Sequence, residues 1–258
     1  MRPLLTRLDR WLMLNRPAYR AGLRPGASAD AIDALAARFE GRFPPLLREL
    51  LGWHDGEGAD HRGALLGTWS LMSTDSIEST LADMAWLVDN DDMAEWWGPD
   101  WIPFLDNGWG DCVCVDLAGA FDGVAGQIVE FSHDSEYRSI THPGLEAWLF
   151  TIVRGFEDGI FALDCHAGVD RWDPVDDAAY RAFISEHYPG YPVTVRVGDD
   201  EPEPELDSGP ASHVPPLPAL DLDRIRGNLR AAGLGDVVVD TAFDLLPRTD
   251  TGRRPPSS

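Results

Sequence analysis

The fold class is decided by three short apolar runs: Trp101-Ile-Pro-Phe104, Cys112-Val-Cys-Val-Asp-Leu117 and Gln127-Ile-Val-Glu-Phe131. They are rich in the β-branched and aromatic residues that favour strands. Two turn-forming segments separate them, Asp106-Asn-Gly-Trp-Gly110 and the Gly-rich stretch 119–126, and such segments typically connect antiparallel strands. The pattern therefore predicts an antiparallel meander.

Helical patterns lie on both sides of this meander. Upstream, apolar residues recur at helical spacing within residues 28–39, 45–51 and 74–88, and downstream they do so within residues 145–156. Ser28 stands where a helix N-cap is expected. Helices, then a meander, then a helix predict an α+β fold, in which helices pack on one face of a twisted antiparallel sheet.

The rest of the chain divides into four parts. Residues 1–22 predict an amphipathic N-terminal helix, and residues 23–164 form the main domain, with one further strand at 63–71. We take residues 165–198 as a C-terminal extension that holds a helix and a strand. Residues 199–258 are rich in Pro and acidic residues, which predicts a partly disordered linker and tail.

Negative charge is concentrated in the middle of the chain. The whole sequence has a net charge of −23, and residues 51–150 carry 19 acidic residues against two Arg, a net charge of −17. Such a segment repels nucleic acid and anionic membranes, and it attracts a cationic protein. The acidity can also serve solubility alone, and the sequence leaves both interpretations open.

Hydropathy and cysteine content indicate the compartment. No apolar run approaches the roughly 18 residues of a transmembrane helix, and charged residues interrupt the first 14 positions, unlike a secretory leader. We therefore expect a cytoplasmic protein. Cys112, Cys114 and Cys165 are too few for a disulfide framework, and one C-x-C pair is a poor zinc signal. We expect buried free thiols.

Two blocks of motifs follow one another along the chain. The first comprises Leu23-Arg-Pro-Gly-Ala-Ser28, Phe43-Pro-Pro-Leu-Leu-Arg-Glu-Leu-Leu51 and His54-Asp55-Gly56. The second comprises Trp97-Gly-Pro-Asp-Trp-Ile-Pro-Phe104, Gly110, Val115-Asp-Leu117, Gly126-Gln-Ile-Val129 and Trp148-Leu149. In these blocks, over roughly residues 20–160, the chain resembles the Smi/Knr family of the SUKH superfamily. It departs from the family pattern at Ala36, Glu40 and Phe43, where Glu, Gly and Leu are common.

The resemblance implies a binding role, because the family has no recognised active site. Its bacterial members look like immunity proteins that neutralise toxins, often encoded beside them, and its fungal members regulate cell-wall synthesis. We expect a non-catalytic, protein-binding domain of this kind, an immunity protein that neutralises a cationic toxin by direct binding. The alternative is a regulatory or scaffolding module of the cell-wall-assembly type, with no toxin partner and with a Pro-rich tail that binds other proteins.

The predicted partner-binding residues share a position in or beside turns of the acidic segment, and they are Trp53, His54, Asp55, Glu57, Asp60, Asp100, Trp101, Asp106, Trp109 and Asp111. The acidic residues would attract a cationic partner, and an amphipathic Trp ring commonly anchors an interface. A core position stays open as the alternative for each Trp.

Catalytic and ligand-binding patterns are weak. The acidic and His residues at 54–61 fit no recognised metal motif. The turn at residues 106–111 places Gly108 and Asp111 in the wrong slots of an EF-hand loop. Pairs of Cys and His lack a flanking signature, and no Gly-rich phosphate cradle is present. We therefore predict no enzymatic activity, no metal and no cofactor.

Overall fold

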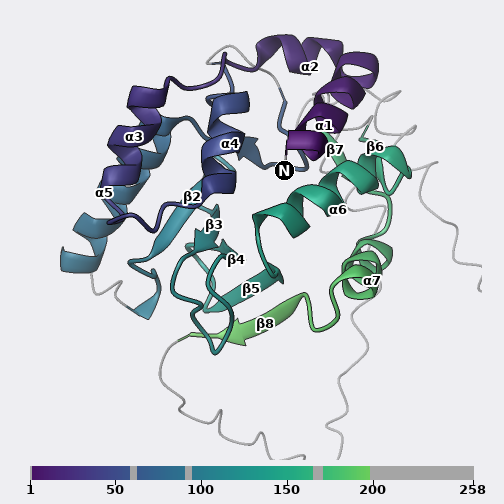
Figure 1. Cartoon of the computed structure of the whole chain (residues 1–258). Helices are drawn as coiled ribbons and strands as arrows, with labels where there is room; N and C mark the ends of the chain where they lie inside the picture. Colours follow the sequence, from purple (N-terminus) through teal and green to yellow (C-terminus); the bar gives the residue numbers. More distant parts are fainter. Residues whose placement is uncertain (1, 59–62, 91–94, 165–170, 198–258) are drawn as a thin grey trace, which may run out of the picture. The chain divides into compact units, whose positions relative to one another are not determined.

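A computed structural model describes residues 2–58, 63–90, 95–164 and 171–197 (Figure 1). These residues all fall within the first of the two units into which the chain divides, Met1–Asp200 and Glu201–Ser258. The predicted tail at 199–258, and the predicted roles of Asp60, His61 and Cys165, lie outside the described residues.

The helices and strands follow one another in the predicted order, helices first and a meander after them. They are α1 (Arg2–Asn15), α2 (Pro17–Gly22), α3 (Ala29–Ala37), α4 (Pro45–Trp53), β1 (Ser70–Leu71), α5 (Thr74–Asn90), β2 (Trp101–Asp106), β3 (Cys112–Asp116), β4 (Gln127–Phe131), β5 (Tyr137–His142), α6 (Leu145–Glu157), β6 (Phe161–Leu163), β7 (Trp172–Pro174), α7 (Asp177–His187) and β8 (Val193–Arg196).

Six strands form one sheet in the order β1-β2-β3-β4-β5-β8, and every neighbouring pair is antiparallel. Strands β6 and β7 form a separate hairpin. The structure thus confirms the α+β fold and the antiparallel sheet. Strand β8 is the strand expected within residues 165–198, and it pairs with β5 at the edge of the sheet.

Both faces of the central strands are buried. All five residues of β3 are buried, so side chains that alternate between the two faces are covered on each. Helix α6 packs on one face, where Phe104 meets Trp148 with ring centroids 5.0 Å apart. On the opposite face Trp97 meets Phe131 at 5.1 Å, so the segment before β2 completes the cover.

The predicted strand at residues 63–71 is wrong for most of its length. Only Ser70–Leu71 forms a strand, because Leu65 N and Leu66 N both donate to Trp69 O (2.9 and 3.4 Å) and fold the segment back. Gly67 has φ +60°, which suits a tight turn. Its N–H donates to Trp172 O (2.6 Å), so the turn docks on β7.

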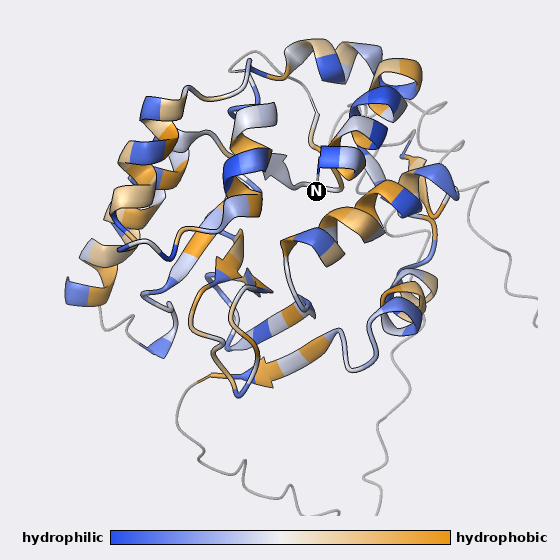
Figure 2. Ribbon diagram, viewed as in Figure 1, coloured by the Kyte–Doolittle hydropathy of each residue, from blue (hydrophilic) through white to orange (hydrophobic). Residues whose placement is uncertain are grey.

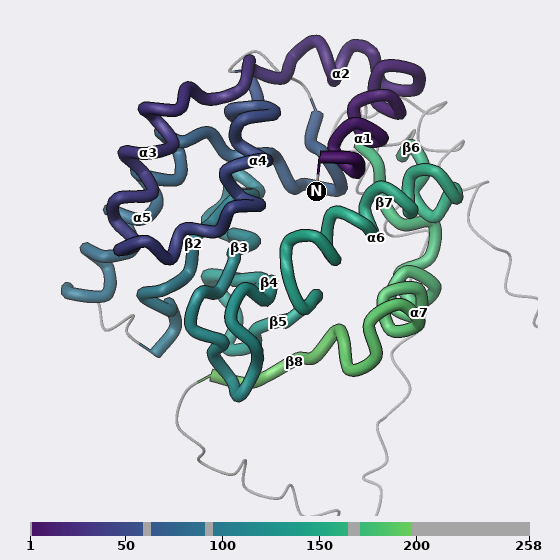
Figure 3. The backbone as a smooth tube through the Cα atoms, viewed as in Figure 1, coloured from purple at the N-terminus to yellow at the C-terminus, as the bar shows by residue number. Residues whose placement is uncertain are grey.

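Helix α1 lies beside α6 (Figure 3). It packs there through an apolar stripe. Leu5, Leu8 and Leu12 are buried, and Trp11 stacks on Phe156 with centroids 4.3 Å apart. Apolar residues run along α6 and the central strands, and polar residues alternate with them on the outer helices (Figure 2). Burial of such apolar stripes is the main force that holds helices of this length in place.

Two further expectations concern the thiols and the membrane. Cys112 and Cys114 are buried and free, as predicted, and burial raises the pKa of Cys112 to about 12, which keeps this thiol protonated and unreactive. In the part of the chain that the structure describes, no helix combines the length and the apolar character that crossing a bilayer would require.

Candidate functional site

The turn between β2 and β3 has a fixed backbone. Asn107 Oδ1 accepts hydrogen bonds from the backbone N–H groups of Trp109 (2.8 Å) and Asp111 (3.2 Å). Asp106 Oδ1 accepts another from Gly108 N (2.9 Å). Side-chain oxygens that accept from N–H groups two to four residues onward stabilise tight turns. The conformation is therefore specified by the local sequence.

Trp109 stands at the tip of this turn with 74% of its surface exposed. Burial of a large aromatic ring stabilises a fold by roughly 2 kcal/mol relative to leaving the ring in water, so exposure forgoes that stabilisation. Here a hydrogen-bonded turn holds the ring outward, although folding gains nothing from that position. A ring presented in this way, between Asp106 and Asp111, is typical of an interface anchor.

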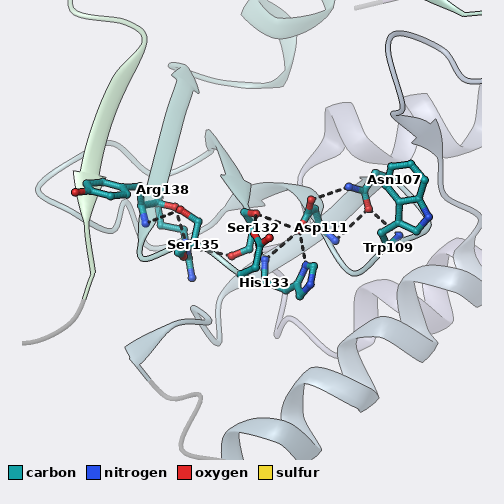
Figure 4. Close-up of polar contacts among 9 residues, drawn as sticks. Asn107, Trp109, Asp111, Ser132, His133, Ser135 and Arg138 are labelled. Carbon is teal, nitrogen blue, oxygen red and sulfur yellow. Dashed lines mark hydrogen bonds and ion pairs between the residues drawn. The ribbon is translucent and has the colours of Figure 1, made fainter. Parts of the chain in front are cut away.

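Asp111 connects this turn to the turn between β4 and β5 (Figure 4). Its Oδ1 accepts from Ser132 Oγ (3.2 Å), from His133 N (3.0 Å) and from His133 Nδ1 (2.8 Å). Its Oδ2 accepts from Asn107 Nδ2 (2.7 Å). One carboxylate thus holds two turns, which are distant in sequence, in one arrangement.

The hydrogen bond between Asp111 and His133 favours the charged form of each side chain. Partial burial opposes ionisation of Asp111, but hydrogen bonds from His133, Asn107 and Ser132 outweigh it and lower the Asp111 pKa. The same side-chain hydrogen bond raises the pKa of His133. Burial raises the pKa of Asp106, and the N–H of Gly108 offsets part of this effect.

Asp111, His133 and Asp134 each offer a ligand-type atom, and these atoms lie within 4.8 Å of one another. However, Asp111 Oδ1 already accepts three hydrogen bonds, and His133 Nδ1 makes one of them. These contacts explain the grouping as a link between two turns.

Arg138 fixes the β4–β5 turn from inside, at the other end of the network in Figure 4. Its side chain is fully buried, and Nη1 donates to the carbonyl oxygens of Ser135 (2.6 Å), Tyr137 (2.8 Å) and Ser132 (3.3 Å). Nη2 and Nε donate to Trp96 O at 3.0 and 3.3 Å. A guanidinium can satisfy several carbonyls in a fixed geometry, so this turn is rigid too.

We call the outward side of these two turns the Trp109 surface. It consists of Asp106, Trp109, Asp111, His133 and Asp134. Three of these were predicted to bind a partner. His133 and Asp134 were not, because only the tertiary structure brings them to Asp111.

The predicted residues at 54–57 have contacts inside the protein. Asp55 is buried, its Oδ1 accepts from Thr74 N (2.7 Å) at the start of α5, and its Oδ2 pairs with Arg24 (3.1 Å). Glu57 accepts from Tyr19 Oη (2.7 Å), and burial raises its pKa. His54 Nδ1 lies 2.5 Å from Arg24 O. These side chains hold the segment before α3 against the start of α5.

The remaining predicted residues also lie mostly inward. Trp101 is only 2% exposed and its ring meets Trp97, so it is a core residue. Trp53 is half-buried, and Asp100 forms an ion pair with Arg42 (2.7 Å). We therefore leave Trp53, Asp100 and Trp101 out of the Trp109 surface.

A second exposed ring, Trp86 on α5, was not singled out from the sequence. It is 59% exposed. At about 100° per residue, position 86 lies roughly 180° around the helix from the buried stripe of Ile77, Leu81 and Met84. An aromatic residue directly opposite the apolar stripe is a signal that the sequence does contain.

Comparisons with known proteins agree with the motif pattern. The SMI1/KNR4 family (SUKH-1) matches residues 26–151. The cell wall biosynthesis/cell cycle regulator smi1 of Schizosaccharomyces pombe is 25% identical over 214 residues, which cover 70% of this chain and 42% of that protein. This chain thus spans less than half the length of that relative. Through residues 26–151 the chain belongs to the SMI1/KNR4 family (SUKH-1), which includes immunity proteins and cell-wall regulators.

Proposed function

We propose that this chain binds a cationic protein through the Trp109 surface and, as an immunity protein, neutralises a toxin by direct contact. The proposal contains no catalytic step and places the chain in the cytoplasm. The observation that carries it is the rigid outward presentation of Trp109, 74% exposed, between carboxylates. Membership of a family that includes immunity proteins supports it.

The chemistry of this surface suits Arg or Lys side chains of a partner. A Trp ring is the best aromatic platform for a guanidinium or ammonium group, and such contacts contribute about 0.5–2 kcal/mol. Asp111 is ionised at neutral pH because hydrogen bonds lower its pKa, and Asp134 is exposed beside it. A cation that stacks on Trp109 thus has carboxylates within reach.

Rigidity of the two turns adds to affinity. A side chain that is already held in its binding position loses little conformational entropy when the partner arrives. The links from Asn107 to Trp109, and from Asp111 to His133, give this preorganisation. The net charge of −17 over residues 51–150 would also accelerate the encounter with a cationic partner.

Co-expression with the product of the neighbouring gene tests the proposal. That product alone should harm the cell, and this chain should restore growth. Trp109→Ala should weaken binding about 30-fold, equivalent to about 2 kcal/mol, whereas Trp86→Ala, the matched control on α5, should leave it unchanged. Affinity should fall at high ionic strength. A harmless neighbour, or equal effects of the two variants, would refute the proposal.

The second candidate is a regulatory or scaffolding module without a toxin partner. It is favoured by the similarity to the smi1 regulator, 25% over 214 residues. A chain that ends after Val197 separates the two candidates, because it keeps β8 paired with β5 and removes only residues 198–258. An immunity role should survive this truncation, whereas a scaffold that works through its Pro-rich tail should not.

A further inference from the structure

A cavity lies away from the Trp109 surface. Its volume is about 350 Å³, and it is lined by residues of the sheet face that carries α6, of α6 itself, of helix α7 and of the β6–β7 hairpin. This volume is at the lower end of those of small-molecule sites. Its apolar wall includes Leu105, Val113, Trp148, Ile152 and Ile184.

The sheet also contributes polar side chains to the lining of the cavity. Val113, Glu130 and Ser139 are opposite one another across β3, β4 and β5, and all three line the cavity. The register shifts between β4 and β5, because Ile128 pairs with His142 and Val129 with Ile140.

The shifted register leaves Thr141 opposite no residue of β4. A residue left unpaired in this way makes a β-bulge, which redirects side chains locally. Accordingly, both Thr141 and His142, although consecutive, line the cavity.

Two residues of this lining each have a buried polar atom without a hydrogen-bond partner, Thr141 Oγ1 and His142 Nδ1. Their residues are 7% and 1% exposed. A buried polar atom without a partner costs about 1–3 kcal/mol, so such atoms are rare unless a ligand or water satisfies them. Each of the two residues thus keeps a polar group for a bound ligand or an ordered water to satisfy.

The contacts of His142 indicate whether its unpartnered Nδ1 is a hydrogen-bond donor or an acceptor. Thr151 Oγ1 donates to Trp148 O (2.8 Å), and we therefore assign the proton of the imidazole to His142 Nε2, which lies 2.8 Å from the same Thr151 oxygen. Burial lowers the pKa of His142 to about 3, so the ring is neutral. The Nδ1 lone pair is then an acceptor that requires a donor.

Glu130 adds a second acceptor to the same space. Burial raises its pKa to about 7, and the attraction of Arg181 on α7 opposes this effect only in part. A positively charged donor beside Glu130 would stabilise the ionised carboxylate. Arg171 also lines the cavity, but its charge is already paired with Asp173 (2.6 Å).

We propose that this cavity binds a small organic cation, with an ammonium or guanidinium head donating to Glu130 and His142 Nδ1 and a short apolar body lying against Trp148 and Ile152. The hydroxyl of Thr141 would complete the contacts of the head. The site is distinct from the Trp109 surface and does not depend on the proposed immunity role.

The test uses the full chain with three probes that share a four-carbon chain: butylamine, agmatine and butanol. The two amines should raise the melting temperature and shift the NMR signals of His142 and of the Trp148 indole, whereas butanol should do neither. A crystal structure with butylamine should show its nitrogen near Glu130. Ordered waters alone in the cavity of that crystal would overturn the proposal.

Variants separate specific binding from general effects of amines. Glu130→Gln keeps the shape and removes the charge, and should weaken amine binding at least 10-fold. Thr141→Val, which removes a hydroxyl without a partner, should fold normally and weaken binding less. Glu146→Gln on the exposed side of α6 is the control and should bind as the wild type does. Equal amine affinity in Glu130→Gln and wild type would also overturn the proposal.

Discussion

The imidazole Nδ1 of His133 lies 2.8 Å from Oδ1 of Asp111, and this contact joins two turns that are 22 residues apart. The Asp111 carboxylate also accepts from the backbone of residue 133 (3.0 Å). As a result, the turn that presents Trp109 cannot move independently of the β4–β5 turn.

The pKa of His133 should depend on Asp111. The hydrogen bond raises the folded-state pKa of His133, so its stabilising effect is present below the ordinary His pKa of about 6.5 and is lost as the pH rises through the folded value. Asp111→Asn should lower the His133 pKa toward 6.5, as measured by NMR titration. Asp134→Asn, the control, should lower it less, and equal shifts in the two variants would contradict the link.

Glu130 and His142 should give stability opposite dependences on pH. In the unfolded state His142 is protonated below pH about 6.5, whereas in the folded state burial keeps it neutral down to about pH 3. The free energy of unfolding therefore falls as the pH drops from about 6.5 toward about 3. Folded Glu130 keeps its proton up to about pH 7, whereas the unfolded state ionises it at a lower pH. Its contribution to the free energy of unfolding is therefore lost as the pH rises through about 7. Arg181 and Tyr180 are the charged and titratable groups of α7 that interact with Glu130.

Glu130→Gln should therefore gain stability over the wild type between pH 5 and pH 8, by at most about 3 kcal/mol. Urea unfolding at several pH values measures the difference. His142→Gln should instead gain relative to the wild type as the pH falls below about 6. A difference between Glu130→Gln and wild type that stays constant with pH would show that the Glu130 pKa is ordinary.

Asp116 should be indispensable for the β3–β4 connection. It is fully buried and its carboxylate accepts from the backbone N–H groups of residues 118–120 and from Gln127 Nε2. Asp116→Asn places an amide donor against these donors and should cost about 3 kcal/mol. Asp122→Asn is the control, because Asp122 is exposed in the same connection and should be replaced at almost no cost. Chemical denaturation of both variants decides.

Gly26 and Gly52 face each other but should respond oppositely to Ala. A Cβ on Gly26 would lie 2.0 Å from Gly52 O, whereas a Cβ on Gly52 would meet nothing within 4 Å. Gly26→Ala must push α4 away and should cost 2 kcal/mol or more, on the order of an overpacked core. Gly52→Ala should stabilise α4 by up to about 1 kcal/mol. Thermal melting compares the two, and a tolerated Gly26→Ala would contradict this close approach.

Local sequence patterns were sufficient to predict an element where that segment itself contains the apolar periodicity, turn or cap residues of the element. Alternating apolar residues and turn glycines predicted β2, β3 and β4, and Ser28 caps α3 as expected, its Oγ accepting from Ala31 N (3.1 Å). By contrast, strand β5 was not predicted, because Arg138 and Thr141 interrupt its apolar pattern. Its strand conformation depends on pairing with β4 and β8 on either side.

The candidate site likewise combines features that the local sequence specifies with features that depend on tertiary packing. The sequence of residues 106–111 specifies the turn that exposes Trp109, since the hydrogen bonds from Asn107 and Asp106 are local. Whether a carboxylate faces water was not predictable from its position in an acidic segment. Asp55 and Asp116 belong to the same charge excess as Asp134, yet the first two are buried acceptors of backbone N–H groups.

The sequence by itself determined the α+β class, the central meander, the family and the shape of the Trp109 turn, because each depends on periodicity, order of motifs or contacts within a few residues. Only the tertiary structure decided which acidic residues and Trp rings face solvent, and that His133 joins Asp111. Burial and long-range hydrogen bonds depend on how distant segments pack together, and no single segment encodes its neighbour in space.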